Sequence, residues 1–266
     1  MSCPSERVRC PNCREDTISA LHWKNPRFHQ CGRCGLIFRV PFPTLTTLAA
    51  LYNTSWTAAD ENPSETGATG SVDARTFVGF LLRALGKPSF SGNRILDFGA
   101  GRGAMASALR EAGADILAIE PFGSDYLKRL GFNAHRDLDE LPSHLRFDGI
   151  VSLEVLEHLL EPREALARLY GRLVDGGWLF VTTPNAAGLP AKLHRERWRE
   201  AAKAGHVLFF TPATLKRILV ETGFRDVRRL RWLVRYSGAP RLRTVLHFVL
   251  QSVLQDGHLR FLAHKA

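Results

Sequence analysis

The stretch Arg94-Ile-Leu-Asp-Phe-Gly-Ala-Gly-Arg-Gly-Ala-Met-Ala-Ser-Ala-Leu109 decides the fold of this 266-residue chain. Its apolar residues Ile95, Leu96 and Phe98 predict a short buried strand, and three glycines follow at alternate positions. From Met105 onward, apolar residues recur at helical spacing. Glycines let a ligand approach the main chain, and the first turn of a helix carries unpaired N–H groups. Strand, glycine turn and helix together therefore predict a ligand site.

Two carboxylates accompany this turn. Asp97 lies at the end of the strand, where it can face a cationic group of a ligand. A second apolar run over residues 116–119 ends in Glu120, and an acid at the end of a second strand can bind both hydroxyls of a ribose. Residues 99–104 also satisfy a relaxed dinucleotide-binding pattern, so an NAD(P)-dependent oxidoreductase stays open as an alternative.

At these residues the sequence resembles the class I S-adenosylmethionine-dependent methyltransferases, whose first motif is an acid followed by G-x-G-x-G. The resemblance implies a set of residues that bind the cofactor: Asp97, Gly99, Gly101, Gly103, Glu120, Asp137 and Ser152. Asp97 and the glycine backbone hold the methionine end, and Glu120 binds the ribose. Asp137 meets the adenine amino group, with a turn or helix cap as its alternative role. Ser152 lines the methyl side.

The same resemblance implies an α/β fold, with a doubly wound, seven-stranded, mostly parallel sheet and an antiparallel last strand. Apolar patterns predict strands at residues 94–98, 116–119, 132–135, 147–153, 178–181, 227–235 and 258–263. They predict helices at residues 44–56, 72–86, 105–112, 122–130, 163–174, 212–222 and 241–254. We expect a mobile loop or lid at 57–71 and a basic insertion at 186–204 that covers the substrate side.

The fourth strand continues into Glu154-Val-Leu-Glu157-His158, which resembles a motif of small class I methyltransferases, including ubiquinone-pathway O-methyltransferases. If this segment begins a helix, its two acids and the histidine lie on one face. The resemblance implies catalytic roles for Glu154, His158 and His206. It also implies a second divalent ion, held by Glu154, Glu157, His158 and His206, as in small-RNA 3′-terminal 2′-O-methyltransferases. The alternatives are that His158 orients or deprotonates an acceptor hydroxyl without metal, or caps the helix.

The N-terminal segment contains two C-x-x-C pairs, Cys10–Cys13 and Cys31–Cys34. Their spacing is typical of a four-thiolate zinc site. Four thiolates leave no open coordination position, so we predict structural rather than catalytic zinc. We therefore expect a zinc ribbon over residues 1–40, a linker with N-terminal cap helices over 41–90, and an S-adenosylmethionine-binding methyltransferase domain over 91–266.

The charge of the chain is unevenly placed. The net charge is +10, and from Lys192 onward 16 Lys or Arg residues stand against 5 Asp or Glu. This region can meet an anionic substrate, a nucleic acid or an anionic membrane surface, or it can be a solvated basic face. No apolar run is long enough for a transmembrane helix, and the first residues lack an apolar signal core, so we expect a cytoplasmic protein.

The leading hypothesis is a methyltransferase that uses S-adenosylmethionine and structural zinc to modify a small-molecule acceptor that is anionic: phosphorylated, nucleotide-linked or lipid-linked. A ribbon before such a domain also resembles bacterial sugar and natural-product methyltransferases. The alternative is a zinc-ribbon protein that binds nucleic acid or modifies RNA on the same fold. The sequence does not predict an oligomeric state.

Overall fold

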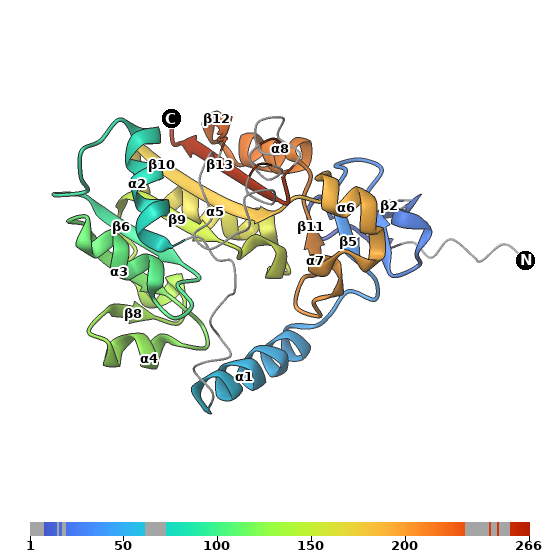
Figure 1. Ribbon diagram of the computed structural model, residues 1–266, viewed down its shortest axis with the longest axis horizontal. Coiled ribbons are helices and arrows are strands. Elements are labelled where there is room, and N and C mark those ends of the chain that lie inside the picture. The colour runs from blue at the N-terminus through green and yellow to red at the C-terminus, as the bar shows by residue number, and fades with distance from the viewer. Residues whose placement is uncertain are drawn as a thin grey trace, which may run out of the picture.

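The computed structural model describes residues 8–14, 16–17, 20–61, 73–231, 245, 249 and 256–266. The described strands form a two-stranded, a four-stranded and a seven-stranded sheet. The seven-stranded sheet occupies the body of the molecule, and the smaller sheets lie at the end that contains the N-terminus (Figure 1).

The seven-stranded sheet has the predicted topology. Its strands in spatial order are β12 (Arg225–Arg229), β13 (His258–His264), β10 (Leu173–Pro184), β9 (Phe147–Leu153), β6 (Arg94–Phe98), β7 (Asp115–Ile119) and β8 (Asn133–His135). The strands from β10 to β8 are parallel, and β13 pairs antiparallel with both β10 and β12. The predicted α/β fold with an antiparallel last strand is confirmed, and that strand lies between β10 and β12.

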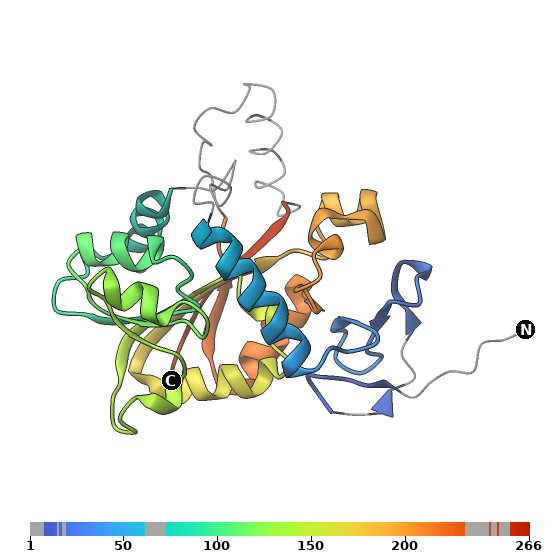
Figure 2. The same ribbon diagram turned by 90° about the horizontal axis from the view of Figure 1, so that it is seen from below.

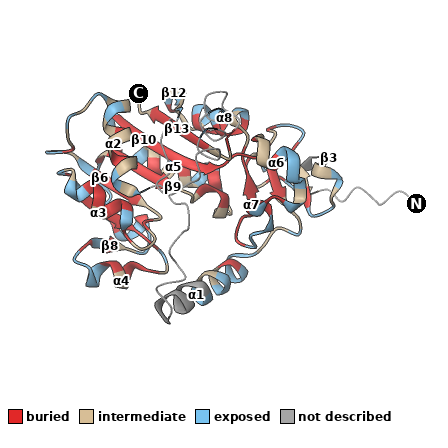
Figure 3. Cartoon of the chain, viewed as in Figure 1, coloured by how far each residue is buried: buried red, intermediate tan, exposed pale blue. Residues whose placement is uncertain are grey.

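Helices cover both faces of this sheet. One group packs on the face that includes Ile95 and Val151: α2 (Ala74–Leu85), α3 (Ala104–Glu111) and α4 (Ser124–Arg129). The other group packs on the face that includes Leu96 and Ile150: α5 (Pro162–Arg172) and α8 (Pro212–Thr222). Successive residues of a strand point to opposite faces, and the middle residues of β6 and β9 are buried because both faces are covered. The buried residues accordingly concentrate in the sheet (Figure 3).

Several predicted boundaries were wrong. Helix α1 (Leu45–Glu61) continues through the first five residues of the predicted 57–71 loop. Strand β10 extends beyond the predicted 178–181 at both ends, and its register against β9 shifts between Leu173 and Trp178. Strand β12 begins and ends earlier than the predicted 227–235. Residues 62–71, residues 232–235 and most of the predicted helix 241–254 lie outside the described residues.

The predicted insertion at 186–204 contains short helices. They are α6 (Leu189–His194), η5 (Arg195–Arg197) and α7 (Arg199–Ala202). Trp198 anchors this segment, because its side chain is buried in a small apolar cluster that also contains Phe28 and Phe209. The remaining short helices are η1 (His22–Lys24), η3 (Leu138–Glu140) and η4 (Leu156–His158).

The N-terminal segment forms two small sheets. The first pairs β1 (Val8–Arg9) with β2 (Asp16–Thr17). The second contains β3 (Ala20–Leu21), β4 (Phe28–Gln30), β5 (Ile37–Arg39) and β11 (Leu208–Phe209), all antiparallel. Strand β11 comes from the predicted methyltransferase domain, yet it pairs with β5 of the predicted ribbon. The two parts of the chain therefore share a sheet.

Helix α1 connects the predicted ribbon to the rest of the chain and runs diagonally across the molecule in the view from below (Figure 2). Its Leu48 is buried in the larger core cluster, and Tyr52 packs partly buried against that cluster. In the described residues, no helix is both long and apolar enough to cross a membrane.

Candidate functional site

The glycine turn after β6 has the conformation that its sequence requires. Gly99, Gly101 and Gly103 have φ values of 79°, 52° and 82°, in the left-handed region that favours glycine. A Cβ on Gly99 would lie 2.3 Å from a methyl of Val155, and one on Gly103 would lie 2.8 Å from a methyl of Leu127. A Cβ on Gly101 would meet no atom of the described residues within 4 Å. Two of the glycines therefore permit close packing, and Gly101 leaves space for a ligand.

Asp97 is a buried acid near the end of β6, and one of its oxygens, Oδ2, lacks a hydrogen-bond partner in the described chain. Burial, together with the nearby charge of Glu120, raises the pKa of Asp97 to about 7 despite the N–H of Ala106. A buried polar atom without a partner is costly. The position therefore fits a cationic ligand group that would pair with the carboxylate.

Glu120, the first residue after β7, reaches the glycine turn. Its Oε2 accepts a hydrogen bond of 2.8 Å from the N–H of Gly101, and its Oε1 accepts one of 3.2 Å from Phe122. Burial raises the pKa of Glu120, although these N–H groups favour the ionised form. The structure thus brings both predicted acids to the same glycine turn.

The structure gives Asp137 the alternative role, that of a cap. Its carboxylate accepts a hydrogen bond from the N–H of Asp139 and caps η3, and it forms an ion pair of 2.6 Å with Arg168. These contacts give no support to the predicted adenine contact. Ser152, by contrast, is completely buried in β9, and its hydroxyl has no partner among the described residues.

The expected helical face at 154–158 was wrong. Glu154 has a φ of 55°, and only the single 3₁₀ turn η4 follows it. Glu154 therefore contacts Thr182 at 2.8 Å and His258 at 3.3 Å, and it does not join the cluster of Glu157 and His158. Although burial opposes ionisation, His258 and the hydroxyl of Thr182 lower the pKa of Glu154 to about 2.

Three of the four predicted ligands of a second ion do lie together. One oxygen or nitrogen from each of Glu157, His158 and His206 lies within 4.8 Å of the others. Glu157 is buried: its Oε2 accepts a hydrogen bond from Thr183, whereas its Oε1 has no hydrogen-bond partner in the described chain and lies 4.0 Å from His158 Nε2. Burial and the charge of His158 lower the pKa of His206 to about 3, so this imidazole is neutral at neutral pH.

The hydrogen bonds of His158 assign its tautomer. Its Nδ1 lies 2.9 Å from the carbonyl oxygen of Gly205 and also contacts the hydroxyl of Tyr52. The hydroxyl of Tyr52 donates to the same carbonyl at 3.3 Å, and a carbonyl oxygen can only accept. We therefore assign the proton to Nδ1 and the lone pair to Nε2. Burial lowers the pKa of His158, which favours this neutral form. The Nε2 atom, on the side of Glu157, is free to accept a proton or bind a cation.

Sequence reasoning missed Tyr52 as a site residue. It lies on α1, and its ring packs against Phe122 at 5.3 Å and edge-on against His158 at 5.4 Å between centroids. In the sequence Tyr52 was only one apolar position of a predicted helix. Its partners Phe122 and His158 lie 70 and 106 positions further along the chain, so no local sequence pattern predicts these contacts.

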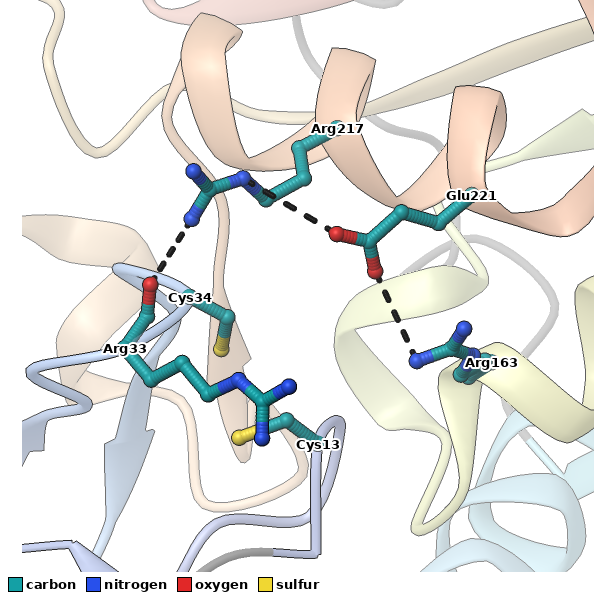
Figure 4. A pocket seen from close by; sticks show the side chains of 6 residues that line it. All are labelled: Cys13, Arg33, Cys34, Arg163, Arg217 and Glu221. Atoms are coloured by element: carbon teal, nitrogen blue, oxygen red, sulfur yellow. Dashed lines mark hydrogen bonds and ion pairs between the residues drawn. The ribbon is translucent and has the colours of Figure 1, made fainter.

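The four cysteines of the C-x-x-C pairs also lie together. Cys10 Sγ lies 3.6 Å from Cys34 Sγ, Cys13 Sγ lies 3.6 Å from Cys31 Sγ, and all four sulfurs lie within 4.8 Å of one another. A pocket separates this cluster from α5 and α8 (Figure 4). Across the pocket, Arg217 donates a hydrogen bond of 2.8 Å to the carbonyl of Arg33, which ties α8 to the second cysteine pair.

Comparison with known proteins identifies the family. The family model described as "Methyltransferase domain" matches residues 73–229. The chain belongs to this methyltransferase family. A ubiquinone biosynthesis O-methyltransferase of Bradyrhizobium sp. is 27% identical over 146 residues, which cover 49% of this chain and 58% of that protein. One from Psychrobacter arcticus is 26% identical over 156 residues and is covered to 60%. The chain thus spans little more than half the length of these curated relatives.

Solved structures support the same fold for this methyltransferase. A 1,6-didemethyltoxoflavin-N1-methyltransferase of Burkholderia thailandensis, with S-adenosylhomocysteine bound, is 18% identical and has a TM-score of 0.55; the match covers 93% of this chain and 100% of that one. A SAM-dependent methyltransferase of Archaeoglobus fulgidus is 23% identical, with a TM-score of 0.52 and coverage of 72% and 94%. Family membership confirms the predicted class of enzyme and removes the oxidoreductase alternative.

Proposed function

We propose that this methyltransferase transfers a methyl group from S-adenosylmethionine to a hydroxyl oxygen of a small-molecule acceptor. The observation that carries the proposal is the pairing of two half-sites at the ends of adjacent parallel strands. Asp97, with its unpartnered Oδ2, lies near the end of β6, and the open Gly101 follows that strand. Glu157 and His158 follow the adjacent strand β9, and His206 joins them from the segment before β11. In open α/β sheets, ligands bind at this carboxyl edge.

The cofactor half-site fits S-adenosylmethionine in charge and in shape. Bound S-adenosylmethionine supplies an electrophilic methyl group on a sulfonium. The Asp97 carboxylate offers an unpaired oxygen to the cationic methionine end, and the space at Gly101 lets the ligand reach the main chain. Glu120 already lies against the turn and offers its carboxylate to the ribose hydroxyls. The protein's task is to hold the acceptor oxygen in line with the methyl group.

The acceptor half-site offers a base. His158 presents the unprotonated Nε2, and the carbonyl of Gly205 fixes this tautomer. A hydroxyl bound here can give its proton to Nε2 as the new bond to oxygen forms, which is general-base catalysis. The relatives' printed name, ubiquinone biosynthesis O-methyltransferase, supports an oxygen acceptor.

The same cluster fits a divalent cation. Two imidazoles and a carboxylate form a donor set that suits transition metals, and Glu157 Oε1 is a buried oxygen whose partner is missing in the described chain. An ion held by Glu157, His158 and His206 would supply a Lewis acid that lowers the pKa of an acceptor hydroxyl. Glu154 is left out of this proposal because it pairs with His258 instead.

We also propose an anionic acceptor. The 186–204 segment precedes the turn that contains His206, and it exposes Arg195 and Arg197 to solvent. Arginine forks favour phosphate and carboxylate groups. This supports a phosphorylated, nucleotide-linked or lipid-linked small molecule.

The cysteine cluster fits structural zinc. A tetrahedron with Zn–S bonds of about 2.3 Å has edges of about 3.8 Å. Two of the Sγ–Sγ separations, 3.6 Å each, are close to this value, and three of the four cysteines are buried. Reduced thiolates of this kind persist in a reducing compartment, which supports a cytoplasmic location.

Two measurements test the proposed function. Calorimetric titration with S-adenosylhomocysteine should give one site per chain, and Asp97→Asn should weaken it while the exposed Asp175→Asn control does not. Native mass spectrometry should show one zinc, and a second ion after incubation with Mn²⁺ or Zn²⁺ if the histidine cluster binds metal. If a chelator removes the second ion and leaves turnover unchanged, His158 acts as the base without metal. Absence of S-adenosylhomocysteine binding would overturn the proposal.

A further inference from the structure

The ribbon sheet reaches the acceptor half-site through strand β11. Leu208 pairs with Phe38 and Phe209 with Ile37, so β11 extends the edge of β5. The pairing continues one residue further, because the N–H of Arg39 donates a hydrogen bond of 2.9 Å to the carbonyl of Val207. The last residue of β5 is therefore next to the segment that contains His206.

The Arg39 side chain binds the same segment at three points. Its Nε donates to the carbonyl of His206 at 3.2 Å, and its Nη2 donates to the carbonyls of Ala201 at 2.8 Å and Lys203 at 3.1 Å. The guanidinium also lies over the ring of Phe28, 5.1 Å from its centroid. Arginine presents several N–H donors in one rigid plane, so a single side chain can hold the turn at 201–206 in one shape.

That turn determines the chemistry of the cluster. The Gly205 carbonyl accepts from His158 Nδ1 and so selects the tautomer with a free Nε2. The N–H of Val207 donates a hydrogen bond of 2.8 Å to the carbonyl of Glu157. The ring of His206 lies edge-on to that of His158, with 4.7 Å between centroids. A shift of the turn would disturb all three residues of the acceptor half-site.

We propose that Arg39 is a positioning residue for the acceptor half-site: from the ribbon it holds the 201–206 turn, which sets the His158 tautomer and the placement of His206. The ribbon is then a structural part of the active centre. This inference rests on the proposed function only in its kinetic consequence, since the tautomer is a property of the free protein.

Other contacts keep the ribbon attached when Arg39 is changed. Arg14 forms ion pairs with Glu161 at 2.7 Å and Glu164 at 3.3 Å, and the Thr214 hydroxyl donates to the carbonyl of Gly35 at 3.2 Å. Arg39→Met should therefore fold with its zinc bound, and the loss should be local. Arg27→Met is a matched control, because Arg27 precedes β4 in the same sheet but its side chain is exposed.

The direct test is nitrogen-15 NMR of the histidine rings without any ligand. Wild type and Arg27→Met should show His158 with a protonated Nδ1 and an unprotonated Nε2. Arg39→Met should show a mixture of tautomers for His158, and Arg39→Lys, which keeps the charge but lacks the planar fork, should show an intermediate state. An unchanged His158 spectrum in Arg39→Met would overturn the proposal.

The kinetic test separates this role from a failure of the proposed function. Arg39→Met should bind S-adenosylhomocysteine as wild type does, and it should lower kcat about 10- to 100-fold, as changes behind a functional residue commonly do. Guanidinium chloride, added to Arg39→Ala far below unfolding concentrations, should restore part of kcat. If Arg39→Met lost affinity for S-adenosylhomocysteine by the same factor as it lost kcat, the site would be generally damaged and a positioning role would be refuted. If wild type itself fails to bind it, the proposed function fails, and the NMR result still decides the role of Arg39.

Discussion

Asp97→Asn should make the ligand-free protein more stable at high pH and a poorer binder of its cofactor. The carboxyl of Asp97 is buried, and its pKa rises from 3.8 to about 7 in the folded protein. A tenfold change in a proton-binding constant corresponds to about 1.36 kcal/mol, so this rise in pKa corresponds to about 4 kcal/mol. Because the pKa of Asp97 is higher in the folded than in the unfolded chain, both states are protonated below about pH 4 and burial carries no charge penalty there. As the pH rises toward 7, the unfolded chain releases the proton more readily, so the free energy of unfolding falls.

Urea unfolding of both proteins between pH 4 and 8.5 measures this effect. The free energy of unfolding of wild type should fall relative to Asp97→Asn by up to about 4 kcal/mol across that range, with the difference constant above about pH 7.5. Asparagine cannot ionise, so any fixed cost of its amide shifts the curve without changing its slope. Asp175→Asn, at a side chain that is 89% exposed, should follow wild type. Parallel curves for wild type and Asp97→Asn would refute the reasoning.

The affinity for the cofactor should change with pH in the opposite direction, rising as the pH rises. Asp97 must ionise to pair with a cationic ligand group, so binding below about pH 7 releases a proton. In wild type, the affinity for S-adenosylmethionine should rise by up to tenfold per pH unit below about pH 7 and stay constant above it. Calorimetry in buffers of different ionisation enthalpy detects that proton. A pH-independent affinity in wild type would show that Asp97 does not contact the ligand.

Three further predictions concern stability and metal. Gly99→Ala places a Cβ 2.3 Å from a Val155 methyl and should lower the free energy of unfolding in urea by about 2–4 kcal/mol. Gly101→Ala should lower it by only about 1 kcal/mol, because of its positive φ, but should weaken cofactor binding in calorimetry. Equal stabilities of the two variants would contradict the packing argument. Cys34→Ser should abolish the zinc seen by native mass spectrometry and lower the Tm, and retained zinc would exclude a four-thiolate site. Burial alone would lower the pKa of His258, but the charge and hydrogen bond of Glu154 together outweigh it and raise that pKa. The ion pair therefore stabilises the fold below about pH 6.5, and its contribution disappears as the pH rises through the raised pKa of His258. The Tm difference between wild type and His258→Gln should thus shrink from pH 6 to pH 9, and a constant difference would disprove the ion pair.

The features that could be predicted from the sequence depend on local patterns. The strand–glycine–helix unit at residues 94–111 is set by neighbouring residues, and so are the spacings of the cysteine pairs. The mostly parallel, seven-stranded sheet with an antiparallel last strand followed from the resemblance, and the strand pairings confirm it. The positions of Asp97 and Glu120 beside the glycine turn were also predictable, because Asp97 lies near the end of β6 and Glu120 directly follows β7.

The features that escaped prediction depend on distant contacts. Glu154 adopts a left-handed backbone conformation that its sequence does not favour, and this turns its side chain to Thr182 and His258. Tyr52 reaches His158 only because α1 folds back across the molecule. The pairing of β11 with β5 joins two-residue and three-residue strands that are too short to carry a pattern of their own.

The pairing of β5 with β11 also affects how the protein is made. Arg39 and His206 are 167 positions apart, so a ribosome exposes the edge of β5 long before its partner strand is synthesised. At about 5–20 residues per second, the delay is about 10 to 30 s. Unpaired strand edges invite association with other chains. Early capture of zinc by the nascent cysteine pairs would shape this segment during the wait, and the completed C-terminal half would then close the exposed edge.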